Sequence, residues 1–227
     1  MTHGVERIEL QLHQPRRLAR LALGIVVIHE LQVGIVIKRF ARQSLPPGRL
    51  LALNGEAGYQ ADTLGPGIHF GFWRWQYQIV KVPVTVVPPG EIALVVSADG
   101  APIPPERILA HVVDSDDFQD ARKFLANGGE RGRQLAVLKA GTYRINTALF
   151  TVITSAESGA HGLTPEMVAV QRVEPDMVGI VTTLDGRPID PGEIAGAVIP
   201  HHDNFQNAQA FLDGGGRRGL QEQEIGR

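Results

Sequence analysis

Short apolar runs separated by glycine and proline turns predict a chain built mainly from strands. Ile92–Ser97 is an apolar run without a helix-length continuation, so we predict a strand there. Further strands are expected over Gln134–Lys139 and Tyr143–Ile153, separated by Ala140-Gly141. Asp99-Gly100 is a turn signal, because glycine accepts a positive φ angle at no steric cost.

One short helix is expected in each strand-rich segment. Asp116 or Asp117 is placed to cap a helix whose apolar face includes Phe118 and Leu125. The glycines of Asn127-Gly128-Gly129 end it. Together the elements predict an α+β fold of tandem β-rich units, each an antiparallel sheet with a short helix.

The order of residues in 89–134 returns in 175–221. The spacing between the two copies is 86 residues and becomes 87 after one inserted residue. A match this long indicates duplicated structural units. The recurring residues are Asp99-Gly100 with Asp185-Gly186, Pro102-Ile103 with Pro188-Ile189, Phe118-Gln119 with Phe205-Gln206, Phe124-Leu125 with Phe211-Leu212, Gly128-Gly129 with Gly215-Gly216, Arg131-Gly132 with Arg218-Gly219, and Gln134 with Gln221.

A fainter copy lies upstream, where Gly58 and Gln60 precede Gly132 and Gln134 by 74 residues. We therefore expect a basic and apolar lead segment at 1–30, a divergent first unit at 31–88, a second unit at 89–174 and a third at 175–227. The third lacks the element that closes the second at Leu138–Tyr143, so Arg227 is expected to lie inside a unit.

The lead segment has two interpretations. Arg16, Arg17 and Arg20 precede the apolar run Leu21–Ile28. The run can be a buried strand after a basic turn or helix, or it can touch a membrane surface with the arginines near anionic headgroups. It is far shorter than the roughly 20 residues needed to cross a bilayer.

Charge and cysteine content exclude several classes of function. The chain has 22 Lys and Arg against 24 Asp and Glu, a net charge of −2, which gives no electrostatic case for nucleic-acid binding. It has no cysteine, which excludes disulfide scaffolds, thiolate catalysis and cysteine zinc sites.

The candidate chemical sites have simpler structural interpretations. The acidic run 114–117 suits Mg²⁺ or Ca²⁺, but the matching run 200–203 keeps one acid, which favours a helix cap. His201-His202 has no third zinc ligand at a familiar spacing, so an exposed turn is expected. The glycines at 65–71 and 214–219 miss the nucleotide-binding patterns and are predicted turns. We therefore predict no catalytic, cofactor-binding or metal-ligating residue and no cofactor.

An aromatic cluster lies between 70 and 77. Packing in the core or on a strand face is expected for it, with contact at a membrane interface as the alternative. Its members are Phe70, Phe72, Trp73, Trp75 and Tyr77.

Two stretches resemble the SPFH (band 7) family, in its bacterial flotillin-like branch. They are N-G-E-A-G-Y-Q-A-D-T-L-G-P-G-I-H-F at 54–70 and R-G-x-Q-x-x-x-L-x-x-G-x-Y-x-I-N at 131–146. The resemblance implies SPFH-type units in a non-catalytic scaffold that associates with the cytoplasmic face of a membrane and forms homo-oligomers. The partners it implies are further copies of the chain and a membrane lipid surface, with no nucleic acid. The alternative is a soluble, cytoplasmic module of repeated β-rich units that binds a ligand or peptide.

Overall fold

The computed structural model describes residues 24–226, which form two compact units. Unit 1 contains the residues up to Thr85 together with Gln119–Arg122 and Tyr143–Leu149. Unit 2 contains Val86–Phe118, Lys123–Thr142 and Phe150–Arg227. Of the expected lead segment 1–30, residues 1–23 lie outside the described part, and Val26–Ile28 forms the strand β1.

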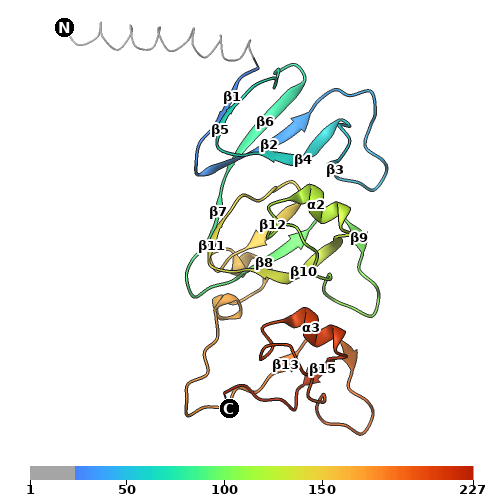
Figure 1. The fold of residues 1–227 in the computed structure, drawn as a ribbon, viewed down its shortest axis with the longest axis vertical. Helices are drawn as coiled ribbons and strands as arrows, with labels where there is room; N and C mark the ends of the chain where they lie inside the picture. Colours follow the sequence, from blue (N-terminus) through green and yellow to red (C-terminus); the bar gives the residue numbers. More distant parts are fainter. Residues whose placement is uncertain (1–23, 227) are drawn as a thin grey trace, which may run out of the picture. The chain divides into compact units, whose positions relative to one another are not determined.

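Unit 1 is built around β2, whose residues Val33, Ile35 and Val36 are buried. Its main sheet has the order β3-β4-β2-β6, and β1 pairs separately with β5 (Figure 1). β2 is antiparallel to β4 and β6, whereas β3 runs parallel to β4. The strands are β2 (Gln32–Lys38), β3 (Leu51–Ala52), β4 (Gly58–Leu64), β5 (Gly67–His69) and β6 (Tyr77–Pro83).

Unit 2 contains two sheets of similar plan. The first has the order β12-β8-β10-β9 and the second β13-β15-β14, and in each the strand after an Asp-Gly turn runs parallel to its neighbour. The strands are β8 (Ala93–Ser97), β9 (Ala101–Pro102), β10 (Glu130–Leu138), β12 (Phe150–Ile153), β13 (Thr182–Thr183), β14 (Arg187–Pro188) and β15 (Arg217–Leu220). The remaining elements are the strand pair β7 (Thr85–Val87) with β11 (Gly141–Tyr143) and the 3₁₀ helices η1 (Ser158–His161) and η2 (Pro165–Val168).

Two short helices, α2 (Ala121–Ala126) and α3 (Ala208–Asp213), occupy corresponding places in the two copies. Phe124 of α2 packs on Phe150 of β12 with ring centres 5.0 Å apart. The glycine after each helix lies under an aromatic ring: a Cβ added at Gly129 would come within 2.4 Å of the Phe124 ring, and one at Gly216 within 2.2 Å of Phe211. Glycine is therefore required at both positions.

The helices begin later than expected. Asp116, Asp117 and Phe118 have φ angles of 52°, 49° and 62°, so the chain makes a left-handed turn there. Asp203–Phe205 does the same in the second copy, with φ angles of 49°, 48° and 64°. The prediction that Asp116 or Asp117 caps the helix is therefore wrong; at α3 the Asn207 side chain is the cap and accepts the N–H of Ala210.

The fold class is mostly β, which corrects the predicted α+β fold of SPFH-type units. The structure is 34% strand and 10% helical, in several small sheets. The sheets are not purely antiparallel, because the Ala101 N–H bonds to the Gly129 carbonyl at 2.9 Å and brings β9 alongside the start of β10 in the same direction. The expected strand Tyr143–Ile153 is also interrupted, since 144–149 is irregular between β11 and β12.

One side-chain contact recurs in the N-terminal, middle and C-terminal copies of the repeat. The Nε2 of Gln60, Gln134 or Gln221 donates to the carbonyls two and four residues earlier, at 2.7–2.9 Å. The carbonyl two residues earlier belongs to a glycine with a φ angle of 115° to 124°. In β4 and β10 the strand register also shifts beside this residue, so the glutamine bridges a local irregularity of the strand.

We expect Gln134→Ala to lower the free energy of unfolding by about 1–3 kcal/mol, because it removes two hydrogen bonds from a buried amide. Gln171→Ala is the matched control, since the Gln171 amide also donates to two carbonyls but is exposed. Urea denaturation followed by circular dichroism measures both. Equal midpoints for the two variants would contradict the structural role of Gln134.

Candidate functional site

The acidic run 114–117 does not gather its carboxylates. Asp114 pairs with Lys123 at 2.6 Å, and the hydrogen bond from that ammonium group holds the pKa of the Asp114 carboxyl below its ordinary value. The next two acids lie in the left-handed turn. Within residues 24–226 no group of three His, Asp or Glu side chains is placed to hold a metal ion.

His202 is buried, which corrects the expectation of an exposed turn for this residue, whereas His201 is exposed as expected. Its Nδ1 accepts the N–H of Phe205 at 2.7 Å, and its Nε2 lies 3.0 Å from Gln223 Oε1. Nδ1 acts as an acceptor, so the ring proton is placed on Nε2. In the middle copy Ser115 accepts the N–H of Phe118 in the same way, at 3.2 Å. Both side chains therefore hold the left-handed turn.

The glycine clusters lie only partly in the predicted turns, because Gly67 belongs to β5 and Gly219 to β15. Gly67 has a φ angle of 132° and begins β5, and Gly215 has a φ angle of 90° and follows α3. Gly215 also donates its N–H to the Leu212 carbonyl at 3.0 Å.

The aromatic cluster is divided between packed and exposed side chains. Phe72 and Tyr77 pack edge to face with ring centres 5.4 Å apart. Phe70, Trp73 and Trp75 are exposed, so the expectation of core or strand-face packing is wrong for these three. The local turn is fixed by the backbone, since the Trp73 carbonyl accepts two N–H groups, from residues 76 and 77, at 2.8 and 2.7 Å.

A cavity of about 560 Å³ lies beside this turn in unit 1. Its lining combines apolar residues, among them Phe72 and Ile79, with the cationic side chains of Arg39, Arg74 and Lys81. Lys81 donates to the Val27 carbonyl and Arg39 to the Gln78 side chain, which fixes two of the three cations.

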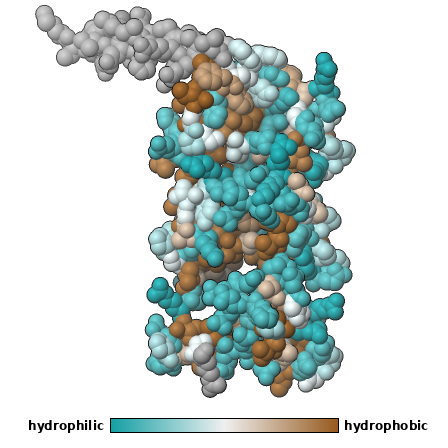
Figure 2. All heavy atoms as spheres, in the orientation of Figure 1, coloured by the Kyte–Doolittle hydropathy of each residue, from teal (hydrophilic) through white to brown (hydrophobic). Residues whose placement is uncertain are grey.

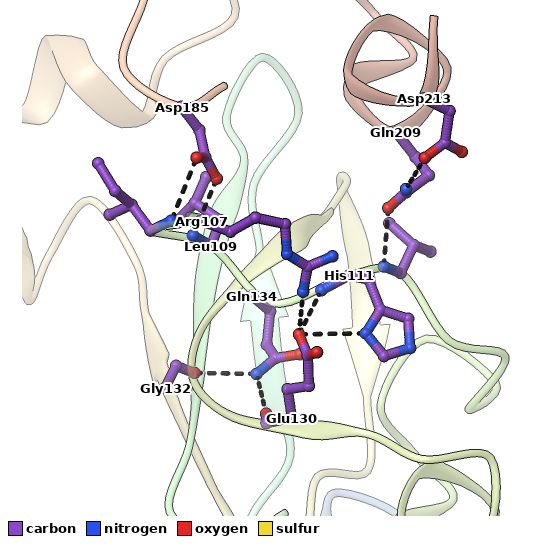
Figure 3. A network of polar contacts seen from close by, with 11 residues as sticks. Arg107, Leu109, His111, Glu130, Gly132, Gln134, Asp185, Gln209 and Asp213 are labelled. Carbon is purple, nitrogen blue, oxygen red and sulfur yellow. Dashed lines mark hydrogen bonds and ion pairs between the residues drawn. The ribbon is translucent and has the colours of Figure 1, made fainter. Parts of the chain in front are cut away.

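A second candidate site lies in unit 2, where residues 108–112 receive side chains from two directions (Figure 3). We call these residues the docking segment. Its own sheet satisfies two of the N–H groups: that of Ala110 bonds to the Arg133 carbonyl at 2.8 Å, and that of His111 to Glu130 Oε2 at 2.9 Å.

The C-terminal copy satisfies the other three. Asp185 accepts the N–H of Ile108 at 3.1 Å through Oδ1 and that of Leu109 at 2.9 Å through Oδ2. Oδ1 also accepts the N–H of Gly186 at 2.8 Å, which fixes the carboxylate, and Asp185 is only 5% exposed. Gln209 of α3 accepts the N–H of Val112 at 3.0 Å.

Sequence reasoning missed this role and interpreted Asp185-Gly186 only as a turn. The available signal was the aspartate itself. Asparagine also suits such a turn, yet both copies have aspartate, and an anionic acceptor makes stronger bonds to N–H groups.

Glu130 is the charged centre of this region. Its carboxylate contacts Arg107 and accepts the backbone N–H of His111, whose ring Nδ1 lies 3.1 Å away. Burial alone would raise the pKa of the Glu130 carboxyl, but these hydrogen bonds and the Arg107 charge outweigh it and hold the pKa below its ordinary value.

A related contact occurs in unit 1. Arg122 is the α2 residue that corresponds to Gln209, and it pairs with Asp62 through two hydrogen bonds at 2.7 and 2.8 Å. The same guanidinium donates to the Leu53 carbonyl at 2.5 Å. Ala52 pairs in parallel with Gln60 as Ala110 does with Gln134, so Leu53 corresponds to His111. α2 and α3 therefore carry side chains to equivalent segments.

Neither the helices nor the comparisons with known proteins assign the chain to a class of protein. None of the helices in the described part is long and apolar enough to pass through a bilayer. No family model, curated protein or solved structure matches this chain.

The lowered pKa of Glu130 predicts a loss of stability in acid. The ionised form is favoured by folding, so its contribution is present above the unfolded pKa, about 4.3, and is lost as the pH falls through the lower folded value. Glu130→Gln should be less stable than the parent chain at pH 7 and should lose less stability on acidification. Urea denaturation at several pH values measures this.

Glu174→Gln is the control for that measurement, because Glu174 is exposed. Its unfolding should follow the parent chain across the pH range. A Glu130→Gln variant with the parent's pH dependence would show that Glu130 does not carry the acid response.

Proposed function

We propose that this chain is a non-catalytic scaffold that works at a membrane surface and assembles with copies of itself, as the resemblance to the SPFH family implies. The observation that carries the proposal is the exposed aromatic turn of unit 1 beside three cationic side chains.

Large apolar side chains are exposed together along residues 68–75. They are Ile68, Phe70, Trp73 and Trp75. Apolar residues, brown in Figure 2, reach the surface of unit 1. An exposed apolar patch of this kind is typical of an interaction site. Tryptophan in particular favours the boundary between lipid and water, because its ring is apolar and its N–H is polar.

The charges beside the patch favour an anionic surface. Arg39, Arg74 and Lys81 line the adjacent cavity, and Arg74 lies between the two tryptophans in the sequence. Each basic residue near an anionic membrane contributes about 1 kcal/mol to binding. A lipid surface with phosphate groups complements both the aromatic and the cationic side chains.

The carboxyl groups with a lowered pKa are poorly suited to act as general acids. Every described carboxyl group with a resolved shift has a lowered pKa, and each accepts hydrogen bonds from backbone or side-chain donors. A general acid at neutral pH needs a raised pKa instead. These carboxylates are therefore suited to holding structure: they are Glu56, Asp62, Asp114, Glu130 and Glu166.

A second candidate function is the binding of a small anionic ligand by a soluble module. It is favoured by the cavity itself, because about 560 Å³ is within the size range of small-molecule sites and three cations line it. A free phosphate-bearing ligand would use Arg39, Arg74 and Lys81 without requiring the exposed aromatic side chains.

We expect the chain to sediment with vesicles of phosphatidylglycerol and phosphatidylcholine, and less with phosphatidylcholine alone. The chain has two tryptophans, both in the exposed turn, so their emission should shift to shorter wavelength on binding. The affinity of Ile68→Ser/Phe70→Ser for the vesicles should be at least about tenfold lower, because two apolar side chains no longer transfer to the lipid interface. This variant keeps both tryptophans as reporters.

The matched control is Ile180→Ser/Leu184→Ser. These residues are 74% and 79% exposed, against 62% and 69% for Ile68 and Phe70, and lie in unit 2. This control should bind like the parent chain. Equal binding by both variants, or none by the parent, would contradict the membrane proposal. Tryptophan quenching by inorganic phosphate without vesicle binding would favour the ligand-binding module.

A further inference from the structure

Residues 194–198 are the equivalent of the docking segment in the C-terminal copy. Gly196 forms a parallel bridge with Gln221, as Ala110 does with Gln134. The Gly196 N–H bonds to the Leu220 carbonyl at 2.8 Å, the same distance as from the Ala110 N–H to the Arg133 carbonyl. The two segments therefore have the same relation to their own sheets.

The two segments differ in what lies against them. In the docking segment the three N–H groups that its own sheet does not satisfy bond to Asp185 and Gln209. Their equivalents are the N–H groups of Ile194, Ala195 and Val198, and none of them has a partner among residues 24–226. Ile194 is 87% exposed.

A fourth donor is open as well. In the middle copy Glu130 accepts the N–H of His111. The corresponding residue of β15 is Arg217, which cannot accept a hydrogen bond and pairs with Asp190 at 2.9 Å. The Ala197 N–H consequently also has no partner in the described part of the chain. These four N–H groups are therefore accepted by no carboxylate among residues 24–226, which favours an acidic partner.

We propose that residues 194–198 are a docking site for a further repeat of the same build. Its Asp-Gly turn places a carboxylate on the N–H groups of Ile194 and Ala195, and its helix brings an acceptor to the N–H of Val198. The inference depends on the contacts inside unit 2 and is independent of the membrane proposal.

The geometry selects this occupant over an apolar partner. In the occupied docking segment Ile108 and Val112 remain exposed although Asp185 and Gln209 are in place. Recognition there uses the backbone donors, two of which are adjacent and match the two oxygens of one carboxylate. A partner for 194–198 is therefore recognised by its fixed carboxylate.

The N-terminal copy of a second chain does not meet this requirement. Three strand residues are equivalent, because each pairs with the glycine that precedes the recurring glutamine by two residues. They are Lys38, Ser97 and Thr183. The residues two positions after these three are, in the same order, Phe40, Asp99 and Asp185. The first segment thus has phenylalanine in place of the aspartate, so the occupant is a repeat of the kind that carries Asp99 or Asp185.

The test extends the full chain by one repeat in register. Arg227 corresponds to Ala140, so a second copy of residues 141–227 is appended directly after Arg227. Amide hydrogen exchange is measured by NMR in the parent and extended chains. We expect exchange at Ile194, Ala195 and Val198 to slow by at least about tenfold in the extended chain.

Two variants identify the carboxylate as the cause. Asp185→Asn in the appended copy should restore most of the fast exchange at Ile194 and Ala195 while the appended strands stay folded. Asp185→Asn at its own position in the parent chain is the positive control and should speed exchange at Ile108 and Leu109.

The proposal is overturned by unchanged exchange at Ile194 and Ala195 in an extended chain whose circular dichroism shows a folded addition. It is equally overturned by an addition that stays unfolded, because the site then fails to support a repeat. Protection that survives Asp185→Asn in the appended copy would also exclude recognition through the carboxylate.

Discussion

Backbone N–H groups that very short strands leave unpaired are the constraint on which this structure depends. Most strands have two to five residues, so a ladder satisfies only part of each segment. Side-chain oxygens complete the pairing. Asp185, Gln209 and Glu130 together supply four acceptors to the docking segment, and Glu56 accepts the N–H of Asn54 in unit 1. Removing such an acceptor leaves a partly buried donor without a partner, which costs more than the bond itself contributes.

Carbonyl groups are satisfied by the same means. The amide nitrogen of one glutamine in each segment bridges two carbonyls where a left-handed glycine interrupts the strand. Apolar packing is concentrated elsewhere, in the rings of Phe118, Phe124 and Phe150 and in the buried residues of β2. The polar positions that recur in the sequence thus maintain the irregular backbone, and the recurring phenylalanines fill the space beneath the helix.

Short apolar runs predicted where several strands lie, and the recurring glycines predicted the turns and the ends of the helices. They could not predict strand direction, because β9 becomes parallel to β10 through one backbone bond to Gly129. They also could not predict the burial of His202, since a histidine that accepts a local N–H has the same sequence as one in an exposed turn. The site at residues 108–112 was missed for a related reason. Its donors are backbone groups, which leave no trace in the identity of those residues.

That reliance on the backbone has a consequence for how such a chain can diverge. The docking segment reads Ile108-Leu109-Ala110-His111-Val112, and its equivalent reads Ile194-Ala195-Gly196-Ala197-Val198. Since any residue except proline offers the same N–H, mutations can accumulate on the receiving side without altering what it recognises. Only the position that supplies the accepting carboxylate requires one particular amino acid, aspartate. Gene duplication could therefore lengthen such an array before the copies became specialised, because each new copy arrives with a receiving edge that needs no matching change.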